Sequence, residues 1–274
     1  MTVKHALAEG VIPPFAGDKL AAMSKPETVT RPGGGAIAYH ALEGAGPGVI
    51  FLGGFMSDMT GTKALALEEH CRRRGRAFVR FDYAGHGASS GAFVEGTIGG
   101  WRDDALAVLD AVTEGPQILV GSSMGGWLAL LVALARPERV AGLIGLAAAA
   151  DFTQDMMWER YCAEVRQTLD RDGVYYQPSA YGDEPYAITR QLIEEGREHL
   201  LLRAPIAIDC PVRLIQGMKD PDVPWRTALR IAEKLTSRDV TVTLVKEGDH
   251  RLSEPDDLVR LTDMVDAIAR KPSR

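Results

Sequence analysis

The chain has 274 residues, of which 46% are hydrophobic and 25% charged, an ordinary composition for a soluble globular protein. Its 37 acidic and 31 basic residues give a formal net charge of −6, which argues against a general nucleic-acid binder because such a protein needs a basic face. Three widely spaced cysteines fit neither a disulfide framework nor a zinc site and indicate a reducing compartment: Cys71, Cys162 and Cys210.

Residues 1–26 contain no apolar stretch of signal-peptide length and include Pro13 and Pro14, so we expect an irregular N-terminal arm. The longest apolar stretch, residues 140–150, is far shorter than the roughly 20 residues that a membrane-spanning helix requires. We therefore expect no membrane span. The arm also lacks the Arg- and Ser-rich composition of a transit peptide, which leads us to expect a cytoplasmic protein.

From about residue 27, short apolar or β-branched runs alternate with helical patterns, which is typical of βαβ units on a mostly parallel sheet. Strands are expected at IAYHALEG, GVIFLGG, AFVRFD, QILVG, VAGLIGLA, VRLIQG and VTVTLVKEG. Helices are expected over 62–74, 101–112 and 124–135, the last buried because it is apolar nearly all round. The pattern predicts an α/β fold whose core comprises residues 27–150 and 206–274.

Residues 151–205 interrupt the alternation with two helical patterns, about 152–171 and 186–202, joined by GVYYQPSAYGDEP. We expect a cap over the strand ends, where such sheets form binding crevices, with a lateral interaction surface as the alternative. Its 11 acidic and six basic residues account for −5 of the chain's net charge of −6. Its aromatic residues either wall a pocket for an apolar acyl chain or only pack the cap onto the core: Trp158, Tyr175 and Tyr176.

The motif G-x-S-x-G occurs twice, at residues 87–91 and 121–125. A nucleophile elbow requires a strand that runs directly into a sharp turn and then a helix, so that the serine hydroxyl stands at the strand end. The sequence ILVGSSMGGWLALLVALA meets this requirement at Ser123. Ser89 lies several residues beyond its strand and no helical pattern follows it. Ser123 is therefore the predicted nucleophile, and Ser89 a loop residue.

A serine nucleophile also needs a histidine base and a carboxylate that orients it. His250 follows the last expected strand, whereas His199 lies in a charged helical stretch of the cap, so His250 is the predicted base. The loop after VRLIQG offers two carboxylates for the acid. Asp220 has the G-x-x-D-x-x-V-P spacing of many triad hydrolases and is preferred, whereas Asp222 is interpreted as a turn or helix-cap residue.

An oxyanion hole needs two backbone NH groups aimed at the developing charge. Met124, directly after the nucleophile, is expected to supply one of them. The loop in VIFLGGFMSDM is expected to supply the other from Phe55, because Gly53 and Gly54 allow close backbone approach. The side chains of Phe55 and Met56 either line the acyl pocket or fill the core.

In these motifs the chain resembles the α/β hydrolases with a serine triad. Within that family it resembles mitochondrial esterases that act on acyl glucuronides and mitochondrial acyl-protein thioesterases. The matching stretches are LGGFMSDMTGTKALALEEHC, RFDYAGHGASSG, GPQILVGSSMGGWLALLVALARPE, QGMKDPDVPW and GDHR. The resemblance implies Ser123, Asp220 and His250 as the triad of a hydrolase of esters or thioesters. Its expected substrate is a small ester or thioester, or an acylated protein, and the chemistry requires no metal or organic cofactor. Gln216 departs from the His that often precedes this glycine in the family.

Other activities use the same residues. C–C bond hydrolases and cofactor-free haloperoxidases share the triad and stay open as alternatives, and a non-catalytic ligand-binding protein with this fold is an alternative of another class. An acidic cap should also repel an anionic substrate unless its charges face outward and its aromatics or arginines face in, the arginines being Arg160, Arg166, Arg171, Arg190 and Arg197.

Overall fold

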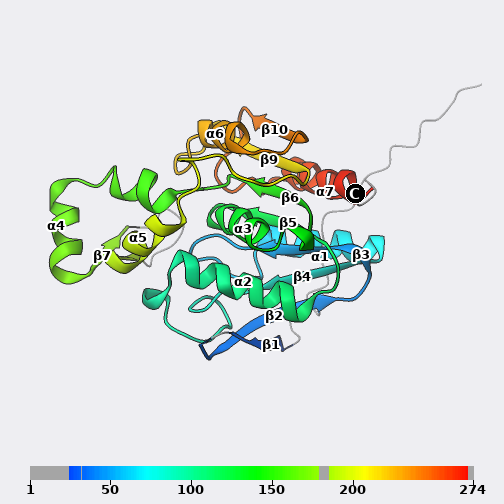
Figure 1. Ribbon diagram of the computed structural model, residues 1–274, viewed down its shortest axis with the longest axis horizontal. Helices are drawn as coiled ribbons and strands as arrows, with labels where there is room; N and C mark the ends of the chain where they lie inside the picture. Colours follow the sequence, from blue (N-terminus) through cyan, green and yellow to red (C-terminus); the bar gives the residue numbers. More distant parts are fainter. Residues whose placement is uncertain (1–24, 32, 179–184, 271–274) are drawn as a thin grey trace, which may run out of the picture.

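A twisted sheet forms the centre of the computed structural model, which describes residues 25–31, 33–178 and 185–270 (Figure 1). The expected N-terminal arm lies almost entirely outside these residues. The eight strands have the order β1-β2-β4-β3-β5-β6-β9-β10, antiparallel at the β1 and β2 edge and parallel from β4 onward. The strands are β1 (Glu27–Thr30), β2 (Ala36–Leu42), β3 (Ala45–Leu52), β4 (Arg76–Phe81), β5 (Gln117–Ser122), β6 (Val140–Leu146), β9 (Val212–Gly217) and β10 (Val240–Val245).

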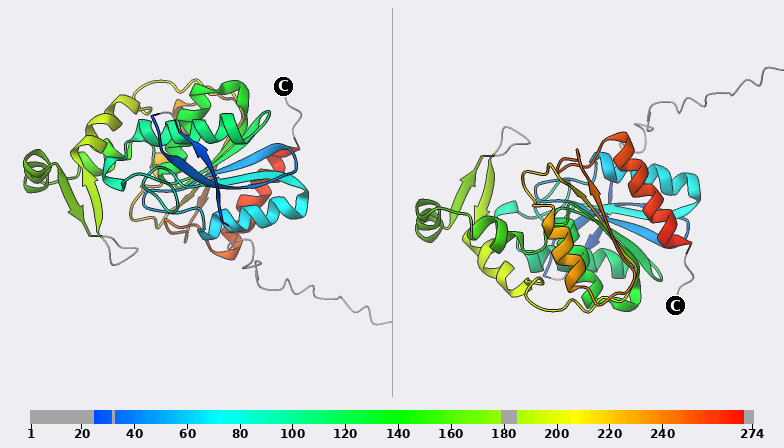
Figure 2. Two further views of the ribbon diagram at one scale, coloured as in Figure 1. Left: turned by 90° about the horizontal axis from the view of Figure 1, so that it is seen from below. Right: turned by 90° about the horizontal axis from the view of Figure 1, so that it is seen from above.

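Helices cover both faces of this sheet, and Figure 2 shows them as two groups on opposite sides. On one face lie α2 (Ile98–Val112), α3 (Met124–Ala135) and α6 (Arg226–Lys234). On the other lie α1 (Thr62–Arg74) and α7 (Pro255–Ala269). Two short 3-10 turns, η2 (Phe93–Glu95) and η3 (Pro137–Arg139), connect elements of the core. The predicted α/β fold with a mostly parallel sheet is confirmed.

Local sequence explains where the central helices begin. Every residue from Met124 to Ala133 in α3 is buried, as expected for a helix without a polar face. Helix α2 begins three residues before the expected start at Trp101, because the Thr97 hydroxyl accepts a hydrogen bond from the Gly100 NH at 3.0 Å and caps the helix.

The chain leaves the core after β6 and forms a segment over residues 151–205, called the cap below, that projects from one side of the core (Figure 1). It contains the π-helical turn η4 (Thr153–Trp158), α4 (Ala163–Asp172), β7 (Val174–Gln177), β8 (Tyr186–Thr189), α5 (Arg190–Gly196) and the 3-10 turn η5 (Arg197–His199). Strands β7 and β8 pair antiparallel as a separate two-stranded sheet.

The hairpin in the cap differs from expectation, because β7 lies in the loop expected between two helices and β8 takes the start of the second expected helix, 186–202. Its strands are rich in aromatic and β-branched residues, which favour a pleated strand over a loop or a helix. The first expected helix, about 152–171, is also divided into η4 and α4, which are separated by residues 159–162.

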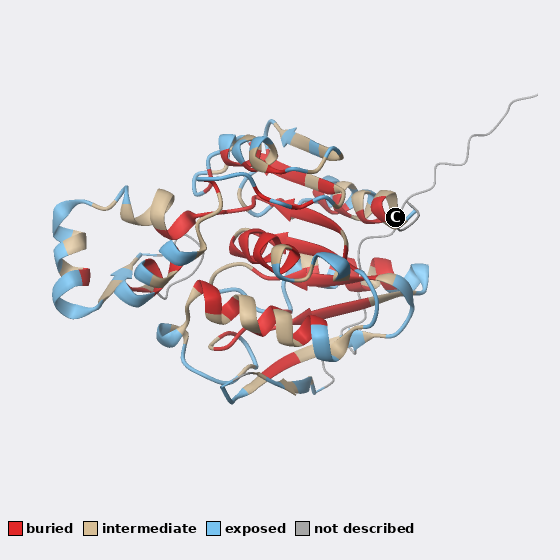
Figure 3. Ribbon diagram, in the orientation of Figure 1, coloured by how far each residue is buried: buried red, intermediate tan, exposed pale blue. Residues whose placement is uncertain are grey.

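Burial differs sharply between the two parts of the molecule (Figure 3). The sheet and its helices bury two large apolar clusters, one on each face of the sheet. The cap has one small cluster of its own, centred on Leu169, Ile188 and Ile193. Within the described ranges, no helix combines the length and apolar character needed to cross a bilayer.

Candidate active site

The turn between β5 and α3 has the geometry of a nucleophile elbow. Strand β5 ends one residue before Ser123 and α3 begins one residue after it. Ser123 has φ 54° and ψ −118°, a strained conformation for a residue with a side chain. A Cβ at Gly121 would lie 2.2 Å from the Gly125 carbonyl oxygen, and one at Gly125 would lie 2.1 Å from that of Leu52. Only glycine fits at both positions, as the motif requires.

Backbone hydrogen bonds hold Ser123 in this strained conformation. Its NH donates to the Leu146 carbonyl at 2.9 Å, and its own carbonyl accepts from the NH groups of Gly126 and Ala149 at 2.9 and 3.0 Å. The elbow is thereby tied both to β6 and to the start of α3.

Ser89, in the second copy of the motif, has a different environment. Its Oγ donates to the Asp82 carbonyl at 2.6 Å and accepts the Ala38 NH at 2.8 Å. The first bond lies within the loop after β4, and the second joins this loop to β2. The Ser89 hydroxyl therefore stabilises this loop, which agrees with the interpretation of Ser89 as a loop residue.

The loops after β9 and β10 bring a carboxylate and an imidazole together. His250 Nδ1 lies 2.8 Å from Asp220 Oδ2, and the Asp220 side chain is completely buried. Asp220 Oδ1 accepts the backbone NH groups of Asp222 and Val223, both at 2.9 Å. Asp222 itself is exposed. Of the two candidate acids, Asp220 is therefore the buried one with a short hydrogen bond to the imidazole.

Asp220, Asp222 and His250 also form the kind of cluster that can hold a metal ion, since one ligand atom of each lies within 4.8 Å of the others. The oxygens of Asp220, however, already accept hydrogen bonds from His250, from two backbone NH groups and from Gln216 Nε2 at 2.9 Å. A cation would have to displace these donors, so the arrangement suits an orienting carboxylate better than a metal ligand.

The two expected oxyanion donors flank the elbow. A Cβ at Gly54 would lie 3.5 Å from Ser123 Cβ, so the loop that carries Phe55 runs directly beside the serine. Met124 is the first residue of α3, where backbone NH groups have no intrahelical acceptor and the helix dipole is positive. Both positions suit a developing negative charge next to Ser123.

The Phe55 ring is fixed where the core and the cap meet. It contacts four aromatic rings edge-on, with centroid distances from 4.9 to 5.9 Å. Phe93 and Trp101 belong to the core, whereas Phe152 and Tyr186 belong to the cap. These contacts restrict the loop whose backbone NH is the expected donor.

Ser123 and His250 line one cavity of about 450 Å³. Its apolar lining comes mainly from the cap and the Phe55 loop, through Phe55, Met56, Phe152, Met156, Met157 and Tyr186. Its charged lining comes mainly from the core, through Asp58, Lys63, Asp222 and Arg251, with Arg160 as the cap's contribution. The cavity therefore offers an apolar wall on one side of the serine and polar groups from the core.

The family model that describes the alpha/beta hydrolase family matches residues 49–261 of the chain. The chain belongs to the α/β hydrolase family. It is similar to the human protein named palmitoyl-protein thioesterase ABHD10, mitochondrial, with 46% identity over 238 residues that cover 86% of this chain and 78% of the relative. The mouse protein of the same name is 48% identical over 240 residues, covering 86% and 80%.

Two solved structures of this family are similar over almost their full length. The alpha/beta hydrolase domain-containing protein 10 from mouse has a TM-score of 0.83 and 44% identity, covering 89% of this chain and 98% of that one. A putative hydrolase from Agrobacterium vitis S4 has a TM-score of 0.87 and 41% identity, covering 90% and 99%. The predicted resemblance to triad hydrolases is confirmed at the level of the family.

One expectation is contradicted by these relatives. The expected cytoplasmic location is wrong by this comparison, because the relatives at 45–48% identity are named as mitochondrial proteins. The folded core does not encode location, so the composition of residues 1–26 was a weak basis for that expectation.

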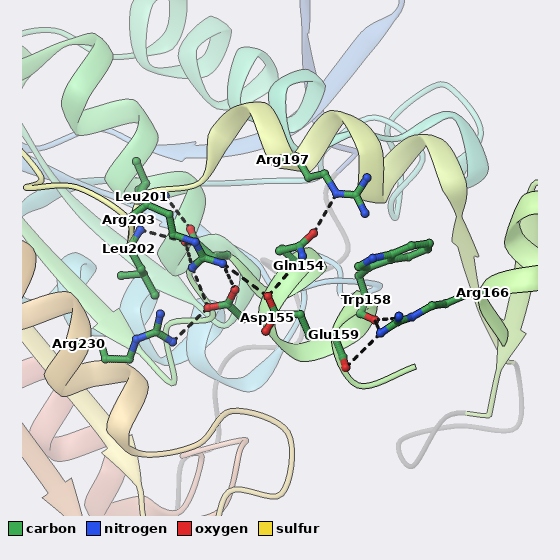
Figure 4. Close-up of polar contacts among 11 residues, drawn as sticks. Gln154, Asp155, Trp158, Glu159, Arg166, Arg197, Leu201, Leu202, Arg203 and Arg230 are labelled. Atoms are coloured by element: carbon green, nitrogen blue, oxygen red, sulfur yellow. Dashed lines mark hydrogen bonds and ion pairs between the residues drawn. The ribbon is translucent and has the colours of Figure 1, made fainter. Parts of the chain in front are cut away.

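The three cap aromatics predicted to wall the pocket of this α/β hydrolase are not part of the cavity lining given by the described residues. Trp158 lies between the guanidinium groups of Arg166 and Arg197, 5.2 and 4.9 Å from its ring centroid (Figure 4). Tyr175 packs edge-on against Tyr161, and Tyr176 is 60% exposed. For Trp158 and Tyr175 these contacts agree with the alternative considered from the sequence, packing within the cap.

Other residues of the cap take the place of these aromatics. Met156 and Met157, directly before Trp158, line the cavity together with Phe152 and Tyr186. A helical pattern alone gives no direction for each side chain relative to a distant serine, so sequence reasoning missed them. The stacking of Trp158 on two arginines shows why the largest side chain in η4 faces elsewhere.

The charges of the cap mostly pair with each other. Arg171 pairs with Asp172 and Arg190 with Glu194, all on the surface. Among the described cap residues, no carboxylate lines the cavity, and of the five arginines considered only Arg160 does. The described carboxylates of the cap therefore do not face the candidate site.

A charged network holds the base of the cap (Figure 4). Buried Asp151, where the cap begins, accepts the NH groups of Leu201 and Leu202 at 2.8 and 2.9 Å, where the cap ends. Asp155 in η4 is bound through both oxygens by Arg203, and Arg230 of α6 donates to it at 3.1 Å. The network joins both ends of the cap to each other and to the core.

Opposing effects set the pKa values of these two carboxyl groups. Burial raises the pKa of Asp151 above its usual range, although its backbone donors and Arg203 oppose the shift. Burial acts in the same direction on Asp155, but the hydrogen bonds and charges of Arg203 and Arg230 outweigh it and lower the pKa of Asp155.

Lys63, in the first turn of α1, lines the cavity and reaches the loop that carries His250. Its Nζ donates to the Arg251 carbonyl at 2.5 Å and to Ser253 Oγ at 3.2 Å. Burial lowers the pKa of Lys63 to about 8, while the charge of Asp249 opposes the shift. Nothing in the sequence distinguished this lysine, because its partners lie near the other end of the chain.

Proposed function

We propose that this α/β hydrolase is a serine hydrolase that releases apolar acyl groups from thioesters and esters through an acyl intermediate on Ser123. One observation carries the proposal: a strained elbow serine shares a cavity with an imidazole that is hydrogen bonded to a buried carboxylate. The predicted class, a hydrolase of esters or thioesters, agrees with the names of the relatives, which are palmitoyl-protein thioesterases.

The proposed reaction has two steps. Ser123 Oγ attacks the acyl carbonyl carbon while His250 accepts its proton, and Asp220 holds the imidazole and stabilises its charge. The NH groups of Phe55 and Met124 bind the oxyanion. His250 then donates the proton to the departing thiolate or alkoxide. In the second step His250 activates water, which cleaves the acyl-serine and restores the free hydroxyl.

The cavity supports an apolar acyl group as substrate. Its apolar lining by Phe152, Met156, Met157 and Tyr186 can replace water around a hydrocarbon chain, and flexible methionines adapt to chains of different length. The relatives' names suggest a palmitoyl thioester on a protein cysteine. We propose a long acyl thioester of this kind as the preferred substrate class.

The nucleophile is tested with a fluorophosphonate probe and with an S-palmitoylated peptide. Ser123→Ala should abolish labelling and lower kcat about a millionfold, because the attacking oxygen is lost. Ser89→Ala is the matched control, since this serine lies in the same motif but bonds to Asp82 and Ala38. It should leave labelling intact. Equal labelling of wild type and Ser123→Ala would refute the assignment.

The substrate class is tested with p-nitrophenyl esters of increasing chain length and with the matching acyl thioesters. We expect kcat/KM to rise with chain length, by up to a few-fold for each buried methylene, as expected from about 0.8 kcal/mol per CH₂. A flat response would contradict an apolar acyl pocket. Labelling of Ser123 without hydrolysis of any ester or thioester would favour the other activities that use this triad.

A further inference from the structure

Gln216, near the end of β9, contacts the carboxylate of the candidate triad. The residue is fully buried, and its Nε2 donates to Asp220 Oδ2 at 2.9 Å. The same oxygen lies 2.8 Å from His250 Nδ1. One carboxylate oxygen is thus shared between the expected base and a buried amide.

The surroundings determine which way the amide of Gln216 points. Its nitrogen faces three acceptors: Asp220 Oδ2, the Val223 carbonyl at 3.2 Å and the Gly217 carbonyl at 3.4 Å. The opposite orientation would place the amide oxygen against three other oxygens. The donor must therefore point toward Asp220.

In this orientation the oxygen of the Gln216 amide is in an unfavourable environment. Gln216 Oε1 is buried and has no hydrogen-bond partner among the described residues. An unsatisfied buried acceptor is unfavourable, and native proteins keep few of them. A hydrocarbon side chain of the same shape would avoid that cost, so the retained donor indicates a role at Asp220.

We propose that Gln216 is a positioning residue of the triad, which disperses the charge of the Asp220 carboxylate and holds it turned toward His250. The inference rests on the proposed function. A hydrogen-bond donor disperses the negative charge of a carboxylate and favours its ionised form. Because an amide does not titrate, this donor is present at every pH at which the enzyme works.

Gln216→Met tests the role, because it keeps the length of the side chain and removes the donor. Without the donor, the charge on Asp220 is less dispersed and stabilises protonated His250 more strongly. We expect kcat/KM for a p-nitrophenyl ester to fall about tenfold, mainly through kcat, and the acid limb of its pH profile to move to higher pH.

Gln117 provides the matched control. It is also buried, at the start of β5, and its Nε2 donates to the Glu114 and Gly115 carbonyls at 2.6 and 3.2 Å, away from the cavity lining. Gln117→Met should lower stability without moving the acid limb. Coincident pH profiles of wild type and Gln216→Met would overturn the inference.

A second variant covers the case in which Gln216→Met does not fold. Gln216→Glu has the same shape, donates to Asp220 only while its carboxyl is protonated, and becomes a repelling acceptor once ionised. Its activity relative to wild type should fall as pH rises through the ionisation of the new carboxyl, whereas a purely structural role predicts a constant ratio. Ser123→Ala, assayed alongside, separates failure of this inference from failure of the proposed function.

Discussion

The core and the cap of this protein are stabilised by different forces. The core buries apolar side chains on both faces of a mostly parallel sheet, whereas the cap has only the small cluster around Leu169 and Ile188 (Figure 3). The cap also packs Phe152 and Leu192 into the core cluster, and it is held in addition by charged contacts such as those of Asp155 and by arginines stacked on Trp158. Apolar packing fixes the core as a whole, whereas in the cap specific polar contacts add to apolar contacts with the core.

This difference matches what each part contributes to the candidate site. Acyl transfer requires reacting groups held in a fixed geometry, and Ser123, Asp220 and His250 all follow strands of the core. Binding of an acyl chain requires shape and apolar surface, which the cap supplies through Met156 and Met157. Rigid packing lies where the chemistry is proposed, and adaptable side chains lie where the substrate is proposed to bind.

Several kinds of contact join the two parts. The Phe55 ring packs against rings from both. The carboxylate of Glu195 in the cap accepts the Gly99 NH at 2.9 Å, at the start of α2. Asp155 pairs with Arg230 of α6. Trp127 of α3 also donates to the His199 carbonyl at 3.1 Å, so the cap is anchored to three core helices and to the expected oxyanion loop.

The largest expected effect tests whether the core alone carries the chemistry. Asp220→Asn should lower kcat about ten-thousandfold, because the amide no longer stabilises the protonated imidazole or its correct tautomer. Asp222→Asn is the matched control, because Asp222 lies two residues further along the same loop and is exposed. It should change kcat less than tenfold. Both are measured with a p-nitrophenyl ester.

The reverse ranking would assign the acid to Asp222. It would also move the orienting carboxylate from a fully buried position to an exposed one. The contrast between a rigid catalytic core and an adaptable cap would then be weaker than the packing indicates.

The same contrast explains which features could be predicted from the sequence. The strands, the elbow at Ser123 and the loop position of His250 depend on local patterns, because a strand, a sharp turn and a helix follow each other directly in the chain. Asp220 could be selected over Asp222 from its spacing to neighbouring residues of one loop.

Features of the cap depend on contacts between segments that are far apart in the sequence. Such contacts could not be predicted from local sequence patterns. The direction of Trp158 is set by Arg197, which belongs to a different element. The strands β7 and β8 stabilise each other, so neither is evident alone. Lys63 and Gln216 gain their significance only from the loops that folding places beside them.

A smaller effect tests whether charged contacts hold the cap. Asp155→Asn removes the charge shared by Arg203 and Arg230, and should lower the free energy of unfolding by about 2 kcal/mol, the usual loss for hydrogen bonds to a charged group. It should also lower kcat/KM for long acyl chains more than for short ones. Urea denaturation and the chain-length series measure the two effects.

Asp172→Asn is the control for this change, since it removes an exposed carboxylate of the cap that pairs only with the neighbouring Arg171 among the contacts described. Exposed pairs contribute little, so its stability and chain-length preference should match wild type. An equal response to both substitutions would mean that the cap is held by its apolar contacts alone.

The smallest effect concerns Lys63, an exception in the core because it is a half-buried lysine bound to neutral acceptors. Burial lowers the pKa of Lys63 to about 8 from 10.5, against the pull of Asp249 and Asp257 and with the repulsion of Arg251. Between these pH values the unfolded chain holds a proton that the folded protein has released. The stability of wild type relative to Lys63→Met should therefore be constant below pH 8 and rise above it, by at most about 1.4 kcal/mol per pH unit.

Urea unfolding of both proteins at pH 7, 8 and 9 measures this difference. Lys219→Met, at an exposed lysine, is the control and should keep the pH dependence of wild type. A stability difference between wild type and Lys63→Met that stays constant from pH 7 to 9 would mean that Lys63 remains protonated in the folded protein and holds the His250 loop as a charged donor. In that case the core, like the cap, would depend on a charged contact beside the candidate site.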